Sequence, residues 1–63
     1  MTNKEWIEIF TILAKYHPNA GVAGADHDII YLEGESEKMS AEDNKRMDEL
    51  GCHEQDGGWC RFV

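Results

Sequence analysis

A broad apolar stripe recurs every three to four residues over the first sixteen positions, which predicts an amphipathic helix. Thr2 and Glu5 have the spacing of a capping box at its start, and Pro18 disfavours helical geometry in the residue before it. We therefore expect a helix from about Asn3 to Tyr16. It is the most apolar segment and should supply most of the core. The stripe consists of Trp6, Ile7, Phe10, Leu13 and Ala14, widened by Ile9, Ile12 and Tyr16.

The segment from Asp28 to Glu33 is the clearest strand, because β-branched and aromatic residues lie between polar ones. Ile30 and Leu32 share one face of this strand, and Ile29 and Tyr31 share the other. Both faces are apolar, so the alternation does not indicate which of them is buried.

Small residues dominate the stretch from Asn19 to Ala25. It is either a loop, a weak strand around Val22-Ala23, or a glycine-rich phosphate-binding loop. A phosphate-binding loop requires a fixed spacing followed by Lys-Ser or Lys-Thr, or a strand-turn-helix context, and this stretch has neither. We favour the short strand, because the residues from Asp26 to Asp28 are suited to a turn into the next segment.

A charged turn from Gly34 to Lys38 precedes a second, capped helix. Ser40 has the position of an N-cap, the helix should run from about Ala41 to Leu50, and Gly51 should end it. We expect this helix to pack lightly and to present a large acidic face, because its apolar edge is thin. That edge consists of Ala41, Met47 and Leu50.

The chain should end in a hairpin that pairs Cys52 to Gln55 with Trp59 to Val63 around Asp56, Gly57 and Gly58. The turn determines whether the two cysteines can bridge. A two-residue turn at Asp56-Gly57 would place Cys52 and Cys60 on opposite faces, whereas a turn centred on Asp56 would place them opposite each other. Cysteines of cytosolic proteins are usually free thiols.

Taken together, these elements predict a small single α+β domain over residues 1–63, in the order α-β-β-α-β-β. Its antiparallel sheet should have two helices on one face. The other face should expose part of a row drawn from Ile29, Tyr31 and Trp59. A domain of about 60 residues buries only about 60% of the surface that its unfolded chain exposes. We therefore expect function to lie on the surface and not in a deep pocket.

The net charge is −7, and it is localised. Eleven of the 13 acidic residues lie between Asp26 and Asp56, together with only three of the six basic ones. Such a field repels phosphate backbones and attracts basic surfaces, which disfavours direct nucleic-acid binding. No apolar run approaches the roughly 20 residues that span a bilayer, and the N-terminus shows no secretory signal. We expect a cytoplasmic protein that does not bind membranes.

Candidate chemistry is sparse. Cys52, His53 and Cys60, with His17 or His27, are numerous enough to ligate zinc. Adjacent residues on a strand point to opposite sides, however, and structural zinc sites usually use close ligand pairs. The same alternation separates His53 from Cys52 as a base and its nucleophile. The adjacent acidic pairs should be solvated in so small a chain, so we expect no enzymatic activity, no cofactor and no metal.

One arrangement of residues extends from His27 to the end of the chain. It consists of His27 to Leu32, Met39 to Asp43, Leu50-Gly51, Asp56, Trp59 and Phe62-Val63. In this arrangement, which covers a little over half of the chain, the protein resembles small uncharacterised acidic proteins encoded by phages and prophages. An aromatic residue often follows the Leu-Gly pair in that pattern, where this chain has Cys52. The resemblance supplies no activity, because the matching residues signal only a strand, a cap and a hairpin.

The resemblance implies a mobile element in a bacterial host cell, a setting in which small acidic proteins often inhibit host defence. By size and charge, the chain also resembles anti-CRISPR and anti-restriction inhibitors that mimic DNA. The resulting hypothesis is a non-enzymatic inhibitor that blocks a basic nucleic-acid-binding surface of a CRISPR or restriction complex. The alternative is a small structural interaction module that associates through an apolar sheet face. We expect the protein to be a monomer or a weak homodimer. The partner-binding candidates are Glu35, Glu37, Glu42, Asp43, Asp48 and Glu49, with Tyr31 or Trp59 as an aromatic anchor.

Overall fold

Helix α1 (Asn3–Tyr16) has the bounds that the sequence predicts, in a computed structural model that describes residues 2–63. The hydroxyl of Thr2 accepts the backbone N–H of Glu5 at 3.2 Å, and the Glu5 carboxylate accepts the backbone N–H of Thr2 at 2.9 Å. This capping box satisfies donors that have no partner within the helix. At the other end, the backbone N–H of His17 donates to the carbonyl of Leu13 at 2.9 Å, and Pro18 follows.

Strands β1 (Val22–Asp26) and β2 (Ile29–Glu33) form an antiparallel hairpin, so the favoured short strand is confirmed. His27 adopts a left-handed conformation with φ of 52° in the two-residue turn between them. The pairing shifts register between Val22 and Gly24, which is the signature of a β-bulge.

Strands β3 (Cys52–Gln55) and β4 (Gly58–Phe62) form the second hairpin. Its two turn residues, Asp56 and Gly57, have φ of 48° and 78°, as a type I′ turn requires. Cys52 pairs with Arg61, so Cys52 and Cys60 lie on opposite faces of the sheet, as a two-residue turn predicts. Both cysteines are free thiols.

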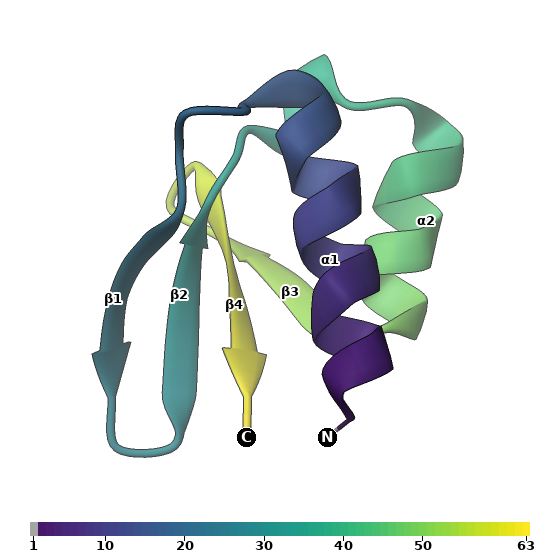
Figure 1. Ribbon diagram of the computed structural model, residues 1–63. Helices are drawn as coiled ribbons and strands as arrows, with labels where there is room; N and C mark the ends of the chain where they lie inside the picture. The colour runs from purple at the N-terminus through teal and green to yellow at the C-terminus, as the bar shows by residue number, and fades with distance from the viewer. Residues whose placement is uncertain (1) are drawn as a thin grey trace.

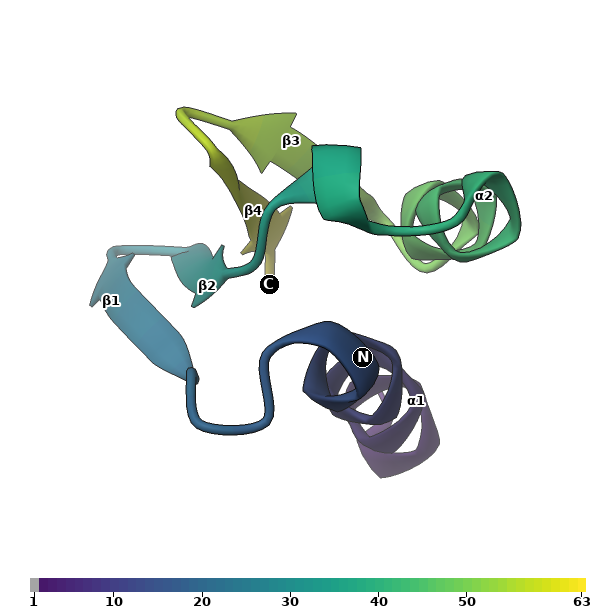
Figure 2. The same cartoon turned by 90° about the horizontal axis from the view of Figure 1, so that it is seen from above.

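The strands form one antiparallel sheet in the order β1-β2-β4-β3, which makes β1 and β3 the edges. Both helices lie on the same face of this curved sheet (Figures 1 and 2). The chain crosses from β2 to α2 (Ala41–Glu49) through a single 3₁₀ turn, η1 (Ser36–Lys38). The hydroxyl of Ser40 caps α2 by accepting the backbone N–H of Asp43 at 3.1 Å. The predicted α+β class and element order are therefore confirmed.

The helices cover the sheet face that carries Ile30 and Leu32, which settles the ambiguity of β2. Leu32 pairs directly with Trp59, so the Trp59 side chain also points to the helices and is only 3% exposed. The opposite, open face carries Ile29 and Tyr31. The expectation that Trp59 might join that exposed row was therefore wrong, because the register of β4 against β2 places it in the core.

The core draws on both helices, on strands β2, β3 and β4, and on the segment before α2. Its buried members are Ile9, Ile12, Leu13, Leu32, Met39, Met47, Leu50, Cys52 and Trp59. Helix α1 supplies three of these nine, so the expectation that it provides most of the core was wrong. The thin apolar edge predicted for α2 is confirmed in part, since Met47 and Leu50 are buried whereas Ala41 is exposed.

Helix α1 buries only part of its apolar stripe. Ile7 is 65% exposed and Phe10 is 39% exposed, and Ala14 also faces outward. Ile9, Ile12 and Leu13 form the buried side of the helix. Beside it, Glu5 and Glu8 face arginines of β4 and α2.

Candidate functional site

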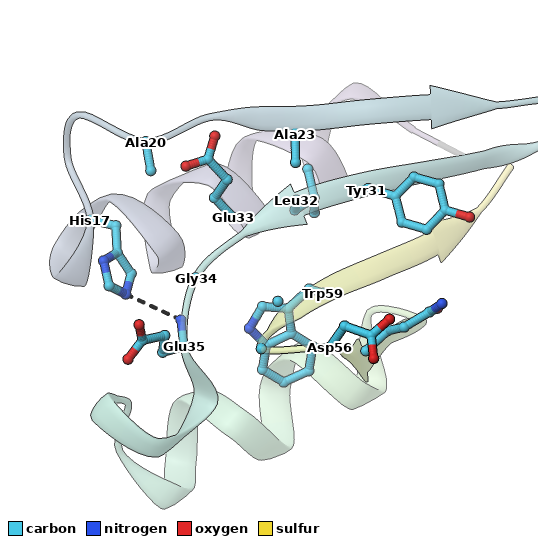
Figure 3. A pocket seen from close by; sticks show the side chains of 13 residues that line it. His17, Ala20, Ala23, Tyr31, Leu32, Glu33, Gly34, Glu35, Asp56 and Trp59 are labelled. Carbon is cyan, nitrogen blue, oxygen red and sulfur yellow. Dashed lines mark hydrogen bonds between the residues drawn. The ribbon is translucent and has the colours of Figure 1, made fainter.

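Five carboxylates gather at the end of the sheet where β2 leaves it and β3 turns into β4. We call this group the acidic end. Figure 3 shows Glu33, Glu35 and Asp56 around a hollow of about 420 Å³ that Gly34 and Trp59 also line. A second hollow of about 400 Å³ lies beside it and is lined by Glu37 and Glu54 together with Glu35 and Asp56. The acidic end thus consists of Glu33, Glu35, Glu37, Glu54 and Asp56.

The backbone positions these carboxylates through pairings that are distant in sequence. Glu33 pairs with Gly58, which brings the end of β2 against the Asp56-Gly57 turn. The hydroxyl of Ser36 then donates to the Glu54 carboxylate at 2.7 Å, which ties η1 to β3. Like charges gathered around shared hollows reinforce one another's field, so this is a locally concentrated negative surface.

Four of the six basic side chains are engaged by carboxylates of the same chain. Lys38 lies 3.3 Å from Glu35, and Lys4 and Lys45 have no ion pair among residues 2–63. Exposed pairs of this kind contribute little stability, but they determine which carboxylates remain available. The other pairs are Lys15–Asp43, Arg46–Glu8, Arg46–Glu49 and Arg61–Glu5.

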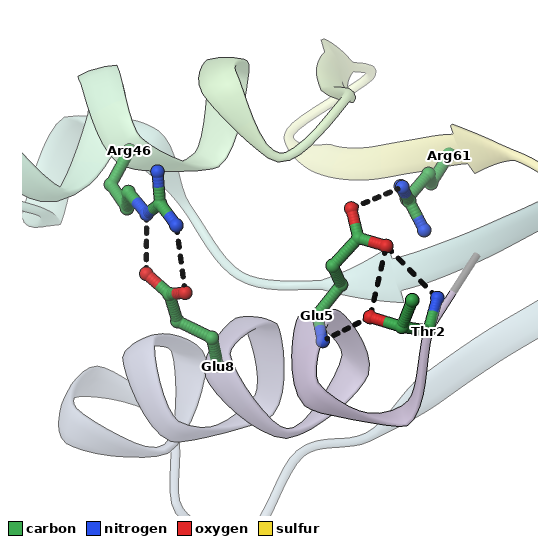
Figure 4. Close-up of polar contacts among 5 residues, drawn as sticks. All are labelled: Thr2, Glu5, Glu8, Arg46 and Arg61. Carbon is green, nitrogen blue, oxygen red and sulfur yellow. Dashed lines mark hydrogen bonds and ion pairs between the residues drawn. The ribbon is translucent and has the colours of Figure 1, made fainter.

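The arginine pairs tie α1 to its neighbours, as Figure 4 shows. Arg46 of α2 holds Glu8 in a two-pronged contact, and one of its bonds measures 2.9 Å from Nη2 to Oε1. This hydrogen bond lowers the pKa of the Glu8 carboxyl below its usual range. Arg61 of β4 reaches Glu5 at 3.4 Å. These carboxylates are therefore turned toward the protein.

Asp43 is a structural residue. Its carboxylate lies 2.7 Å from the Lys15 ammonium and accepts the Tyr16 hydroxyl at 2.5 Å. The same Tyr16 oxygen accepts the backbone N–H of Ser40 at 3.1 Å. The Lys15 and Tyr16 contacts lower the pKa of the Asp43 carboxyl, and its side chain is only 16% exposed. Asp43 therefore anchors α2 to α1 and is poorly placed to contact a partner.

The remaining acidic residues predicted as partner contacts fall into two groups. Glu35 and Glu37 belong to the acidic end. Glu42, Asp48 and Glu49 lie exposed on α2. Two basic residues of the same helix, Lys45 and Arg46, partly offset their negative charge, and Arg46 lies 3.5 Å from Glu49. Within residues 2–63, the carboxylates of Glu37, Glu42 and Asp48 have no ion pair or side-chain hydrogen bond. Asp43 is held against α1, so the six candidates are not equally available to a partner.

The two predicted aromatic anchors lie on opposite faces of the sheet. Tyr31 is half-buried on the open face, opposite Cys60, and is accessible to a partner. Trp59 is not, because its side chain is in the core. Trp59 as a surface anchor is therefore a wrong prediction, and the cause is the same register that buries it beside Leu32.

Sequence reasoning did not find Glu33, Glu54 and Asp56 as members of the acidic surface. The turn at Asp56 and the end of β2 were both predicted, but their proximity depends on the pairing of β2 with β4. The central position of β4 in the sheet has no local signal. The sequence signal that could have indicated this surface is the negative charge of the residues that flank the predicted strands.

The thiols have no catalytic arrangement within the described chain. Burial raises the pKa of the Cys52 thiol to about 11, which keeps it protonated near neutral pH. Cys60 lies on the other face and is also buried. Among residues 2–63, no group of three or more His, Cys, Asp or Glu side chains is arranged to hold a metal ion.

Comparison with known protein families, curated proteins and solved structures finds no match to this chain. Among the described residues, no helix has the length and apolar character needed to cross a membrane.

Proposed function

We propose that this protein is a non-enzymatic acidic inhibitor of a mobile element, which mimics nucleic acid and blocks a basic surface of a host defence complex such as CRISPR or restriction machinery. The observation that carries the proposal is the acidic end. It concentrates five carboxylates at one end of the sheet, where Lys38 is the only cation among residues 2–63 in an ion pair with them. A basic groove that neutralises DNA phosphates presents the complementary charge.

The intramolecular ion pairs support this proposal. They occupy most of the basic side chains, so few cations remain to offset the exposed carboxylates. The carboxylates of the acidic end also belong to exposed residues, so they need no conformational change to meet a partner. Tyr31, at the rim of the same hollow, adds an aromatic contact of the kind that interfaces favour.

The test begins with capture of a partner from a bacterial lysate, followed by titration of the purified partner with two matched variants. Glu37→Gln with Asp56→Asn removes two carboxylates from the acidic end, and asparagine tolerates the left-handed backbone at position 56. Glu42→Gln with Asp48→Asn removes the same two residue types from α2. We expect the first variant to bind on the order of tenfold more weakly and the second to bind nearly as the natural protein does. Equal losses would contradict a contact at the acidic end.

A second candidate function is favoured by the open sheet face. Phe62, which pairs with Ile29, is 58% exposed there, near the half-buried Ile29 and Tyr31. In this alternative the protein is a structural interaction module that associates through that face. A salt series separates the two candidates, because a complex made by the acidic end weakens as salt screens it, whereas an apolar complex persists.

A further inference from the structure

His17 lies where the C-terminal end of α1 meets the segment that leads into η1. It is the C-cap residue of α1 and is half-buried. Its Nε2 atom accepts the backbone N–H of Glu35 at 3.2 Å, as the dashed line in Figure 3 shows. Among residues 2–63, this N–H has no other acceptor. A single imidazole nitrogen therefore holds the backbone of one member of the acidic end.

The residues on either side of Glu35 differ in how firmly they are held. The carbonyl of Ser36 accepts the side-chain amide of Asn44 at 3.0 Å, which ties η1 to α2. Gly34, on the other side, has φ of 149°, a backbone conformation that favours glycine. Loss of the bond to His17 would therefore free Glu35 next to a conformationally permissive residue, while Ser36 stays attached to α2.

The charged groups around His17 are mainly acidic. The carboxylates that line the same hollow belong to Glu33, Glu35 and Asp56. In the described part of the chain, no ion pair joins them to His17. The nearby cations are already engaged, since Lys15 lies 2.7 Å from Asp43 and Lys38 lies 3.3 Å from Glu35. Protonation of His17 would thus place a new positive charge beside these carboxylates, at the C-terminal end of a helix, where the backbone also attracts cations.

Protonation also changes the hydrogen bonding of the ring. A neutral imidazole has one nitrogen that donates and one that accepts, whereas both nitrogens of the protonated ring are donors. Protonated His17 therefore cannot accept the N–H of Glu35. Histidine is the side chain that ordinarily changes its charge between about pH 5 and 8. The hydrogen bond to Glu35 and the positive charge of the ring exclude each other, and pH selects between them.

We propose that His17 is a pH-sensitive latch on the acidic end. The unprotonated ring holds the backbone N–H of Glu35 and leaves the carboxylates of the hollow without a histidine cation. As the pH falls, protonation breaks this hydrogen bond, releases Glu35 and adds a positive charge to the hollow. Both changes weaken the acidic end as a surface for a basic partner. The latch itself is a property of this chain alone, whereas its effect on a partner rests on the proposed function.

An NMR titration from about pH 8 to about pH 5 tests the latch without a partner. We expect the ring signal of His17 and the amide proton of Glu35 to follow the same titration curve. His17→Gln should abolish this transition at Glu35, because the glutamine carbonyl can accept the N–H and does not become protonated in this range. The matched control is His27→Gln in the turn between β1 and β2, where the side chain is 90% exposed, and it should leave the transition unchanged. An amide of Glu35 that stays constant while His17 titrates would overturn the proposal, as would the same transition in His17→Gln.

Titration of a captured partner at about pH 8 and about pH 5.5 measures the effect of the latch on binding. The natural protein is compared with His17→Gln at each pH, which cancels the pH response of the partner itself. On acidification, the natural protein should lose about two- to threefold more affinity than the variant, as expected for one added charge in a solvated surface. Equal losses would overturn the regulatory role of His17. A partner whose binding does not depend on the acidic end at either pH would contradict the proposed function instead, and the NMR titration alone would then decide the latch.

Discussion

The two helices cover the same face of one sheet, yet different forces hold them there. Helix α1 has more apolar residues than the core accommodates, so Ile7 and Phe10 face outward. Helix α2 buries Met47 alone along its length and adds ion pairs with α1. The comparison shows how each helix determines the surface that it leaves exposed: α1 leaves an apolar one, and α2 leaves a charged one.

The largest effect should come from the apolar attachment of α2. Met47 has no exposed surface, so Met47→Ala should lower the free energy of unfolding by about 2–5 kcal/mol through lost burial and the cavity it creates. Ile7→Ala removes a residue of similar size from the outer face of α1 and should cost less than about 0.5 kcal/mol in the monomer. Urea unfolding at low protein concentration measures both. Similar losses for the two variants would contradict the assigned orientation of α1.

Lowering the pH should weaken mainly the ion pairs and hydrogen bonds that join α2 to α1. The contacts with Arg46 and with Lys15 and Tyr16 lower the folded-state pKa of the Glu8 and Asp43 carboxyls. Because these values lie below those of the unfolded chain, the stabilisation is present at neutral pH and is lost as the pH falls through them. At pH values under about 4, we expect the melting temperature to decrease.

Hydrogen exchange at low pH should show which helix responds first. The amides of α2 should lose protection before those of α1, whose attachment is mainly apolar. Asp43→Asn serves as the control, and its stability should vary less with pH than that of the natural protein. An identical pH dependence in the two proteins would contradict the anchoring role of Asp43.

The smallest effect on stability should come from the acidic end. Glu37→Gln with Asp56→Asn removes two charges that make no ion pair among the described residues. The free energy of unfolding should change by less than about 0.5 kcal/mol, with a slight gain at low salt from reduced repulsion. A loss above about 1 kcal/mol would show that the fold requires these carboxylates. Thermal melts at two salt concentrations provide the measurement.

Local signals account for what the sequence predicts correctly. The capping box and Pro18 define α1, Ser40 begins α2, and the Asp56-Gly57 turn determines the register of the last hairpin. Each of these features acts over a few residues. The separation of Cys52 from Cys60 follows from the same turn, because the side chains of a strand alternate.

What the sequence does not predict has a different origin. The burial of Trp59, the structural role of Asp43 and the composition of the acidic end all depend on contacts between distant segments. The sequence does not indicate that β4 lies beside β2, or that Tyr16 meets Asp43 across 27 positions. In a small domain with apolar residues around much of one helix, such contacts determine which surface remains free.

The central claim is that the acidic end occupies a basic nucleic-acid-binding surface, and competition tests it most directly. A captured partner is mixed with fluorescently labelled nucleic acid and titrated with the protein at fixed salt, while fluorescence anisotropy reports the bound nucleic acid. We expect the natural protein and the Glu42→Gln, Asp48→Asn variant both to release the nucleic acid. The Glu37→Gln, Asp56→Asn variant should require on the order of tenfold more protein to do so. A partner that holds the nucleic acid and this protein at the same time would contradict it.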